Sequence, residues 1–140
     1  MKHTLLGSTH VLLLLSGEKI IETIKVFCVQ NKITAATLQA IGAVREVELG
    51  FYKLGEKKYA WKKTKAELEI DGLLGNIALL NNDVIVHAHM TVSDSEMHAF
   101  GGHLKEAVVG ASCEIFLTPL PGTLERRQDE STGLNLLQLP

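Results

Sequence analysis

The stretch VIVHAHMTV, residues 84–92, has the most regular alternation in the chain. Side chains of a β-strand point alternately to its two faces, so every second residue shares a face. One face of this stretch is wholly apolar and carries Val84, Val86, Ala88, Met90 and Val92. The opposite face carries His87 and His89. The alternation therefore predicts a strand with one face in the core and a pair of histidines on the other.

Most of the remaining chain also shows β-strand patterns. Six further strands are expected, at residues 9–15, 36–41, 44–52, 66–70, 76–80 and 107–117. The first is expected to be buried on both faces, because residues 11–15 are all apolar. Gly42 lies between two strands and predicts a bulge or bend. Pro119 should end the last strand because proline has no N–H to donate, and the leucines of the tail predict that it packs back on the body.

One helix is expected, over residues 18–31. Apolar side chains recur there at helical spacing, namely Ile20, Ile24, Phe27 and Cys28. Ser16 is expected to cap its N-terminus. Together with the strands, this predicts an α/β (α+β) chain with many strands and few helices.

Length and composition exclude several classes of protein. A chain of 140 residues has room for one ordinary domain. The 14 Lys and Arg against 16 Asp and Glu exclude a polycation that binds nucleic acid or anionic membranes over its whole surface. Two cysteines without a Cys-x-x-Cys pair exclude a cysteine zinc finger and a disulfide scaffold. The apolar run 11–15 is too short for a membrane span or a signal peptide. We therefore expect a single cytoplasmic domain over residues 1–140 with no membrane contact.

Three histidines form a candidate metal site. His87 and His89 project from the same strand face about 7 Å apart, given the rise per residue of a strand. His103 follows two glycines, Gly101 and Gly102, which let the backbone approach the site closely. Three histidines with an open fourth position are typical of a reactive zinc site. The alternative is a half-exposed polar strand face that binds no metal.

A lysine-rich stretch is the candidate nucleic-acid interface. Six lysines fall within 13 residues: Lys53, Lys57, Lys58, Lys62, Lys63 and Lys65. Lysines contact phosphates without sequence preference, and the interleaved Tyr52, Tyr59 and Trp61 could stack on bases. The alternative, which we favour, is a solvated hairpin, because the rest of the chain has 8 basic and 15 acidic residues.

The remaining reactive residue types carry weaker expectations. If the metal site is reactive, Glu67 and Glu69 are the best acid/base candidates, and exposed carboxylates without a role are the alternative. Cys28 and Cys113 are expected to be inert core residues. The other histidines are expected to be exposed or structural: His3 and His10, without partners, and His98, in a loop.

Several motifs together resemble the PPC domain (plants and prokaryotes conserved). They are Gly42-Ala43-Val44, Glu69-Ile70, Leu73-x-Gly75-x-Ile77, His87-x-His89, Gly101-Gly102-His103-Leu104, Cys113-Glu114-Ile115 and the tail Arg126…Asp129…Thr132-Gly133-Leu134. The resemblance implies a single compact domain, PPC-like, with a bent, mostly antiparallel sheet and one main helix, that assembles as a homotrimer. It also implies a zinc ion on His87, His89 and His103, as in prokaryotic members that stand alone.

The plant members of this family differ from this chain in two features. They carry an AT-hook centred on Arg-Gly-Arg, and this chain contains no Arg-Gly-Arg. Their partner-binding stretch Gly-Arg-Phe-Glu-Ile-Leu corresponds to residues 66–71, where only Glu69 and Ile70 match and Glu67 replaces the arginine. Plant partners are therefore not expected to bind this chain.

Three hypotheses follow from the sequence. The first is a homotrimer that holds a divalent metal, zinc by preference, for ligand binding or for a metal-dependent reaction. The second is a DNA-binding or regulatory protein that uses the lysine-rich stretch 53–65. The third is a structural trimer whose histidines bind nothing. No substrate follows from the fold or from three histidines.

Overall fold

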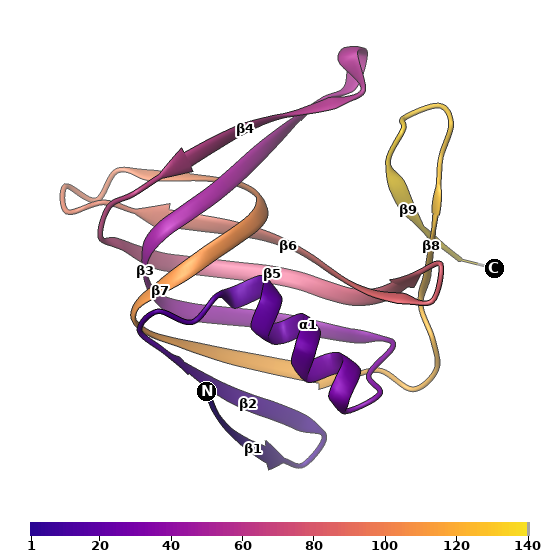
Figure 1. The fold of residues 1–140 in the computed structure, drawn as a ribbon, viewed down its shortest axis with the longest axis horizontal. Helices are drawn as coiled ribbons and strands as arrows, with labels where there is room; N and C mark the ends of the chain where they lie inside the picture. Colours follow the sequence, from indigo (N-terminus) through magenta and orange to yellow (C-terminus); the bar gives the residue numbers. More distant parts are fainter. Residues whose placement is uncertain (140) are drawn as a thin grey trace.

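One sheet of nine strands carries most of the residues that the structure describes, 1–139, and a single α-helix packs against it (Figure 1). The structure is a computed structural model. Its elements are β1 (Lys2–Leu6), β2 (Thr9–Leu15), α1 (Ile20–Gln30), β3 (Ala36–Lys53), the 3-10 turn η1 (Leu54–Glu56), β4 (Lys58–Thr64), β5 (Leu68–Leu80), β6 (Asp83–Ser93), β7 (Ala99–Pro119), β8 (Glu125–Gln128) and β9 (Asn135–Gln138).

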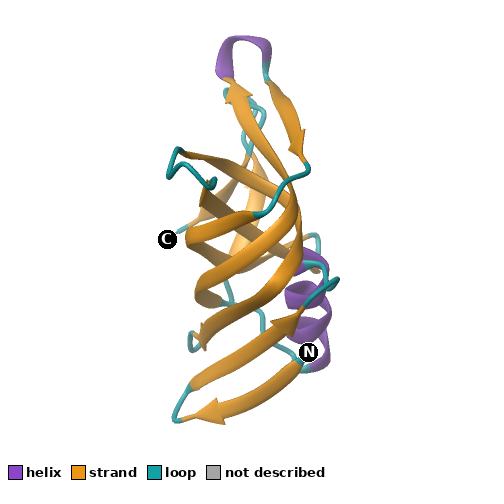
Figure 2. Cartoon of the chain, turned by 90° about the vertical axis from the view of Figure 1, so that its left-hand side faces the viewer, coloured by secondary structure: helices purple, strands orange, loops and turns teal. Residues whose placement is uncertain are grey.

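The sheet is antiparallel except where β5 and β8 meet. Strands β3, β5, β6 and β7 pair in a closed ring, because β6 pairs with both β5 and β7 and β3 does the same. The β1–β2 hairpin extends the sheet at one end of the molecule, and the β3–β4 hairpin protrudes at the other (Figure 2). The bent, mostly antiparallel sheet with one main helix is as predicted.

Strand β6 separates the core from the histidine pair. Its apolar face is buried around Ala88, Met90 and Val92, beneath helix α1. Helix α1 contributes the four core residues predicted for it: Ile20, Ile24, Phe27 and Cys28. Because the faces alternate, His87 and His89 point away from this core.

Two predictions at the N-terminus are wrong. Only Leu12 and Leu14 of strand β2 are fully buried, so the strand has one core face and not two. It lies near the sheet edge beside β1, an exposed strand that the sequence did not predict. Helix α1 starts after Lys19 without a side-chain cap, so Ser16 does not cap it.

Strand pairing shifts register near two glycines without ending the strands. The pairing of β3 shifts register around Gly42, whose φ of 144° and close approach to the Ser112 carbonyl leave no space for a Cβ. This confirms the predicted bulge, but residues 36–53 form one strand and not two. Strand β5 is likewise continuous through an irregularity between Ile70 and Gly72.

The tail returns to the body, as predicted, but through hydrogen bonds and not through the leucines on which the prediction rested, since Leu136 is 40% and Leu139 is 72% exposed. The amide of Leu79 in β5 donates to the carbonyl oxygen of Leu124 (2.8 Å), and the Tyr52 hydroxyl donates to the carbonyl oxygen of Thr132 (2.6 Å). Strand β7 ends at Pro119, also as predicted. Between residues 1 and 139, the structure has no helix of the length and apolarity that crossing a membrane requires.

Candidate metal centre

The sheet brings the three predicted histidines together. His87 and His89 come from β6, and His103 lies directly opposite His89 where β7 pairs with β6. The ring centroids are 5.4 Å apart for His87 and His89, 5.0 Å for His87 and His103, and 5.4 Å for His89 and His103. Residues 14 positions apart in the chain therefore form one cluster because β6 and β7 are joined as a hairpin.

The spacing of the ring nitrogens fits one metal ion. Each histidine offers a nitrogen, and the three nitrogens lie within 4.8 Å of one another. Zinc binds histidine nitrogen at about 2.0–2.1 Å, so two nitrogens on one ion are at most about 4.2 Å apart. Small ring rotations are enough for all three to reach a common ion.

His103 has a nitrogen that the described residues leave without a partner. Its Nδ1 is buried and neither accepts nor donates a hydrogen bond within the described residues. Buried polar atoms are nearly always paired, and each exception needs an explanation. A nitrogen that serves as a metal ligand is such an explanation, so the donor set fits a metal ion.

Burial keeps two of the rings in their metal-binding form. The pKa of His87 is lowered from 6.5 to about 4, mainly by burial and then, in decreasing order, by the charges of Arg126, His103 and His89. The pKa of His103 is also lowered, mainly by burial and then by His89 and Arg126. Both rings are therefore neutral at pH 7, which leaves each with one lone pair for a metal.

The site includes an arginine that the sequence reasoning did not select. Arg126 reaches back from β8, and its Nη2 donates to Oδ1 of Asn76 (2.7 Å) and to Nδ1 of His87 (3.1 Å). Its Nη1 donates to the carbonyl oxygen of Asn135 (2.8 Å). Its only signal in the sequence was its place in the tail motif Arg126…Asp129, which assigned it no role, because the tail reaches the site only through the folding of β8 across the end of β5.

Aromatic rings of the β3–β4 hairpin form a wall beside His103. Tyr59 stacks on Trp61 at 4.6 Å and lies 4.9 Å from the ring of His103. Tyr52 packs on the edge of Tyr59 at 4.9 Å. The rings expected to stack on bases therefore pack against one another and against His103 of the candidate metal site.

Glycines allow the close backbone approach that was expected near His103. A Cβ on Gly102 would lie 2.8 Å from the carbonyl oxygen of Gly50, and one on Gly101 would lie 2.7 Å from that of Met90. Gly50 in turn leaves the space that Trp61 and Tyr59 fill.

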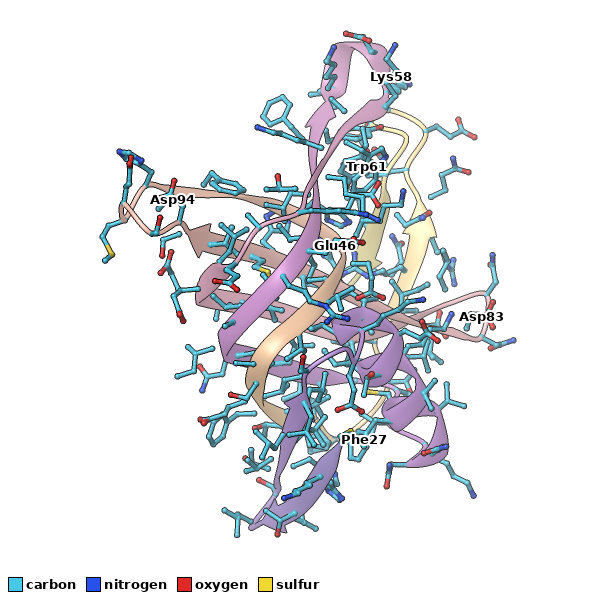
Figure 3. The ribbon with its side chains drawn as sticks, turned by 60° about the vertical axis from the view of Figure 1, so that its left-hand side comes forward. Phe27, Glu46, Lys58, Trp61, Asp83 and Asp94 are labelled. Atoms are coloured by element: carbon cyan, nitrogen blue, oxygen red, sulfur yellow. The ribbon has the colours of Figure 1, made fainter. Side chains whose placement is uncertain are left out.

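The lysine-rich stretch forms the protruding hairpin, and most of its charges are paired. Figure 3 shows Lys58 at the tip and Trp61 nearer the body. Lys53 and Lys58 pair with Glu56. Lys63 and Lys65 pair with Glu46, which lies outside the lysine stretch. Lys57 donates to the carbonyl oxygen of Glu130 (2.7 Å), which ties the hairpin to the tail. Lys62 is the remaining predicted member, at a position opposite Leu49.

The two acid/base candidates lie apart from the histidines. Glu67 precedes β5 and Glu69 is an exposed residue of β5, paired with Ser93 of β6. Ser93 is four residues beyond His89, about 13 Å along the strand. A role for Glu67 or Glu69 stays a prediction.

The other histidines and the cysteines complete the comparison with the sequence. His3 and His10 are partners of each other, contrary to prediction, with Nε2 of His3 and Nδ1 of His10 2.9 Å apart. His98 lies in an exposed loop, as predicted. Cys28 and Cys113 are buried, and burial raises the pKa of each thiol to about 12, so both are inert core residues as expected.

Solved structures with this fold come from bacteria and archaea. The chain is 36% identical to a metal-containing protein from Archaeoglobus fulgidus, with a TM-score of 0.88 over 95% of this chain and 94% of that one. It is 32% identical to a plant- and prokaryote-conserved (PPC) protein from Pyrococcus horikoshii (TM-score 0.90, 99% and 96% covered). It is 31% identical to a protein from Ralstonia eutropha JMP134 named "Putative DNA-binding protein" (TM-score 0.93, 99% and 96% covered).

A family model extends this similarity to the sequence. The model of the Plants and Prokaryotes Conserved (PCC) domain matches residues 1–121, which include all three histidines of the cluster. The comparison with curated proteins gives no match. With most of its length matched by the model, the chain belongs to the plants and prokaryotes conserved domain family.

Proposed function

We propose that this protein binds a divalent metal ion, zinc by preference, through His87, His89 and His103. The observation that carries the proposal is the convergence of three imidazoles around one point, with a buried Nδ1 of His103 that has no hydrogen-bond partner in the described part of the chain. The similar protein from Archaeoglobus fulgidus is named metal-containing, which agrees with this. Three protein ligands leave an open coordination position, where zinc acts as a Lewis acid or binds a ligand.

Elemental analysis of untagged protein tests the metal site. We expect about one zinc per chain in the parent and less than a tenth of that in His89→Ala, because two histidines hold zinc too weakly to survive dialysis. His10→Ala is the matched control, since it also removes a histidine from a cluster but should keep full occupancy. A parent that is free of metal and also refuses added zinc would remove the proposal.

The homotrimer is part of the same proposal. The outer face of the sheet carries exposed apolar side chains in one cross-strand row: Leu74 is 68% exposed and Phe116 is 40% exposed, on either side of Gln39. A second copy of the chain would cover this face. We expect light scattering to give three times the chain mass, and Leu74→Glu with Phe116→Glu to give the single-chain mass. Val29→Glu, on the exposed side of α1, should leave the assembly intact.

DNA binding by the β3–β4 hairpin is the second candidate function. The name of the similar Ralstonia eutropha protein and the protrusion of the hairpin favour it. The ion pairs of Lys53, Lys58, Lys63 and Lys65 with glutamates weigh against it, because they offset the charge available for phosphates. If this candidate is right, duplex DNA shifts in a gel at low salt and the shift disappears when Lys57, Lys58, Lys62 and Lys63 become glutamine. No shift at low salt excludes it.

A further inference from the structure

Arg126 is a buried cation that has no counter-charge among residues 1–139. The residue is only 8% exposed, yet none of the ion pairs within residues 1–139 includes it. A guanidinium stays protonated in proteins, and burying a charge is costly unless an opposite charge is near. The hydrogen-bond acceptors of Arg126 are all uncharged: Asn76 Oδ1, the Asn135 carbonyl oxygen and Nδ1 of His87.

One donor of Arg126 is also unused. Its Nε is buried and has no hydrogen-bond partner among the described residues. An unpaired buried donor destabilises the fold, so such groups are usually retained where they bind something. The planar fork of a guanidinium matches two oxygens of a carboxylate or phosphate. Charge and geometry both indicate an oxyanion.

The contact between Arg126 and His87 is incompatible with a metal on His87. Arginine can only donate, so Nδ1 of His87 is the acceptor and the single proton of the neutral ring is on Nε2. A metal at Nδ1 would need the lone pair that Arg126 uses. A metal at Nε2 would move the proton to Nδ1, where it would face an N–H of Arg126. In either case Arg126 must leave His87 when the metal binds.

We propose that Arg126 binds the oxyanion group of a ligand, a carboxylate or a phosphate, beside the metal, and that it turns from His87 to this oxyanion when the metal binds. The inference rests on the proposed metal site. It follows that metal and oxyanion bind cooperatively, because an oxyanion offsets the charge of both the ion and the guanidinium. The family model matches residues 1–121 and so does not reach Arg126, although the tail Arg126…Asp129 is among the motifs by which the sequence resembles the family.

The test of this cooperativity is the zinc affinity of the protein, measured by competition with a coloured chelator. The measurement is made with and without oxyanion at constant ionic strength. Acetate and inorganic phosphate are separate arms, which distinguish a carboxylate from a phosphate ligand. In the parent we expect at least one of them to tighten zinc binding tenfold or more, since linkage between two ligands is reciprocal. In Arg126→Gln the same oxyanion should change zinc affinity less than twofold. Zinc alone should bind at least as tightly as in the parent, because neither the charge of Arg126 nor its hydrogen bond to His87 then opposes the metal. Arg127→Gln, which removes an exposed arginine paired with Glu125, should behave like the parent.

The outcomes separate this inference from the proposed function. A parent that binds no zinc overturns the metal site and the inference with it. A parent that binds zinc but shows the same oxyanion effect as Arg126→Gln, or none, overturns only the inference. If Arg126→Gln does not fold, nitrogen-15 NMR of the unaltered protein decides: the Nε–H signal of Arg126 should move on adding oxyanion to the zinc-loaded protein. A signal that does not move rejects the role of Arg126.

Discussion

The molecule holds two groups of histidines at different ends of the sheet, and they differ in what their ring nitrogens already bind. At the β1–β2 hairpin, His3 and His10 share one hydrogen bond of 2.9 Å and both pack against the ring of Phe27 at about 5 Å. At the β6–β7 hairpin, three rings converge, and one buried nitrogen has no hydrogen-bond partner within residues 1–139. Proximity is common to both groups, so proximity alone does not define a metal site.

The difference lies in the lone pairs that remain available. In the His3–His10 pair, one ring donates to the other, so the acceptor nitrogen is already engaged and only two ligands are present. In the triad, Arg126 engages only the lone pair of His87, and no hydrogen bond among residues 1–139 engages a ring nitrogen of His89 or His103. Zinc sites need three or four protein ligands, which only the triad supplies.

The backbone beneath the two groups should respond very differently to an added methyl group. A Cβ on Gly75 would overlap the carbonyl oxygen of His87 and lie 2.9 Å from the Cβ of Ala88, so β5 and β6 would have to separate. We expect Gly75→Ala to lower the free energy of unfolding by about 3 kcal/mol in urea titrations. It should also lower zinc occupancy, because His87 moves with β6.

Gly7, in the turn between His3 and His10, is the matched position. It has a φ of 59° and no heavy atom near its would-be Cβ. Gly7→Ala should therefore cost only about 1 kcal/mol of backbone strain, and Gly7→Asn less, because asparagine tolerates this conformation. Equal costs at Gly75 and Gly7 would contradict the tight packing of β5 under His87.

The triad was predictable from sequence where its determinants are local. Alternation in residues 84–92 predicted both the strand and the shared face of His87 and His89, because the period of a strand depends only on the backbone. His103 is linked to them by a short hairpin, and its placement also came from the family resemblance. The sequence predicted strand ends around Gly42 and Gly72, where the structure has irregularities within continuous strands. A glycine in a strand pattern is compatible with either a break or a bulge.

Arg126 and the His3–His10 pair were not predictable, because each depends on contacts distant in sequence or on an unrecognised strand. An arginine in a polar tail predicts exposure, and only the return of β8 to β5 buries it. His3 had no predicted partner because β1 was not recognised. Its five residues are exposed, so they lack the one-sided apolar pattern of a core strand.

The pH dependence of folding should distinguish the two groups next. The folded-state pKa of His87 is about 4 against 6.5 for an ordinary histidine, so between these values the unfolded chain takes up a proton that the folded chain does not. Stability is therefore full above pH 6.5 and falls as the pH is lowered toward 4. His103 acts in the same direction. With a half-buried ring we expect His87 to account for about 2 kcal/mol of the loss in zinc-free protein.

His87→Asn should flatten this pH dependence while its amide oxygen still accepts a hydrogen bond from Arg126. His10→Asn should flatten it less. Burial and His3 also lower the pKa of His10, but only the shift of His87 is large enough to reach about 4. Urea titrations at pH 7, 6, 5 and 4.5 give the slope of the free energy of unfolding against pH for each variant. An unchanged slope in His87→Asn would mean that this ring is not the group that resists protonation.

The smallest effect should be the coupling between His3 and His10. A double-mutant cycle with His3→Ala and His10→Ala should give about 0.5–1 kcal/mol, the usual net contribution of one hydrogen bond. Zinc should not change this value, because the pair offers two ligands and has a nitrogen already occupied. The same cycle on His89 and His103 should show a coupling that rises with zinc, since both would hold one ion. A His3–His10 coupling that also rises with zinc would mean that two histidines in a hydrogen bond can still recruit the metal, and the number of free lone pairs would no longer separate the two groups.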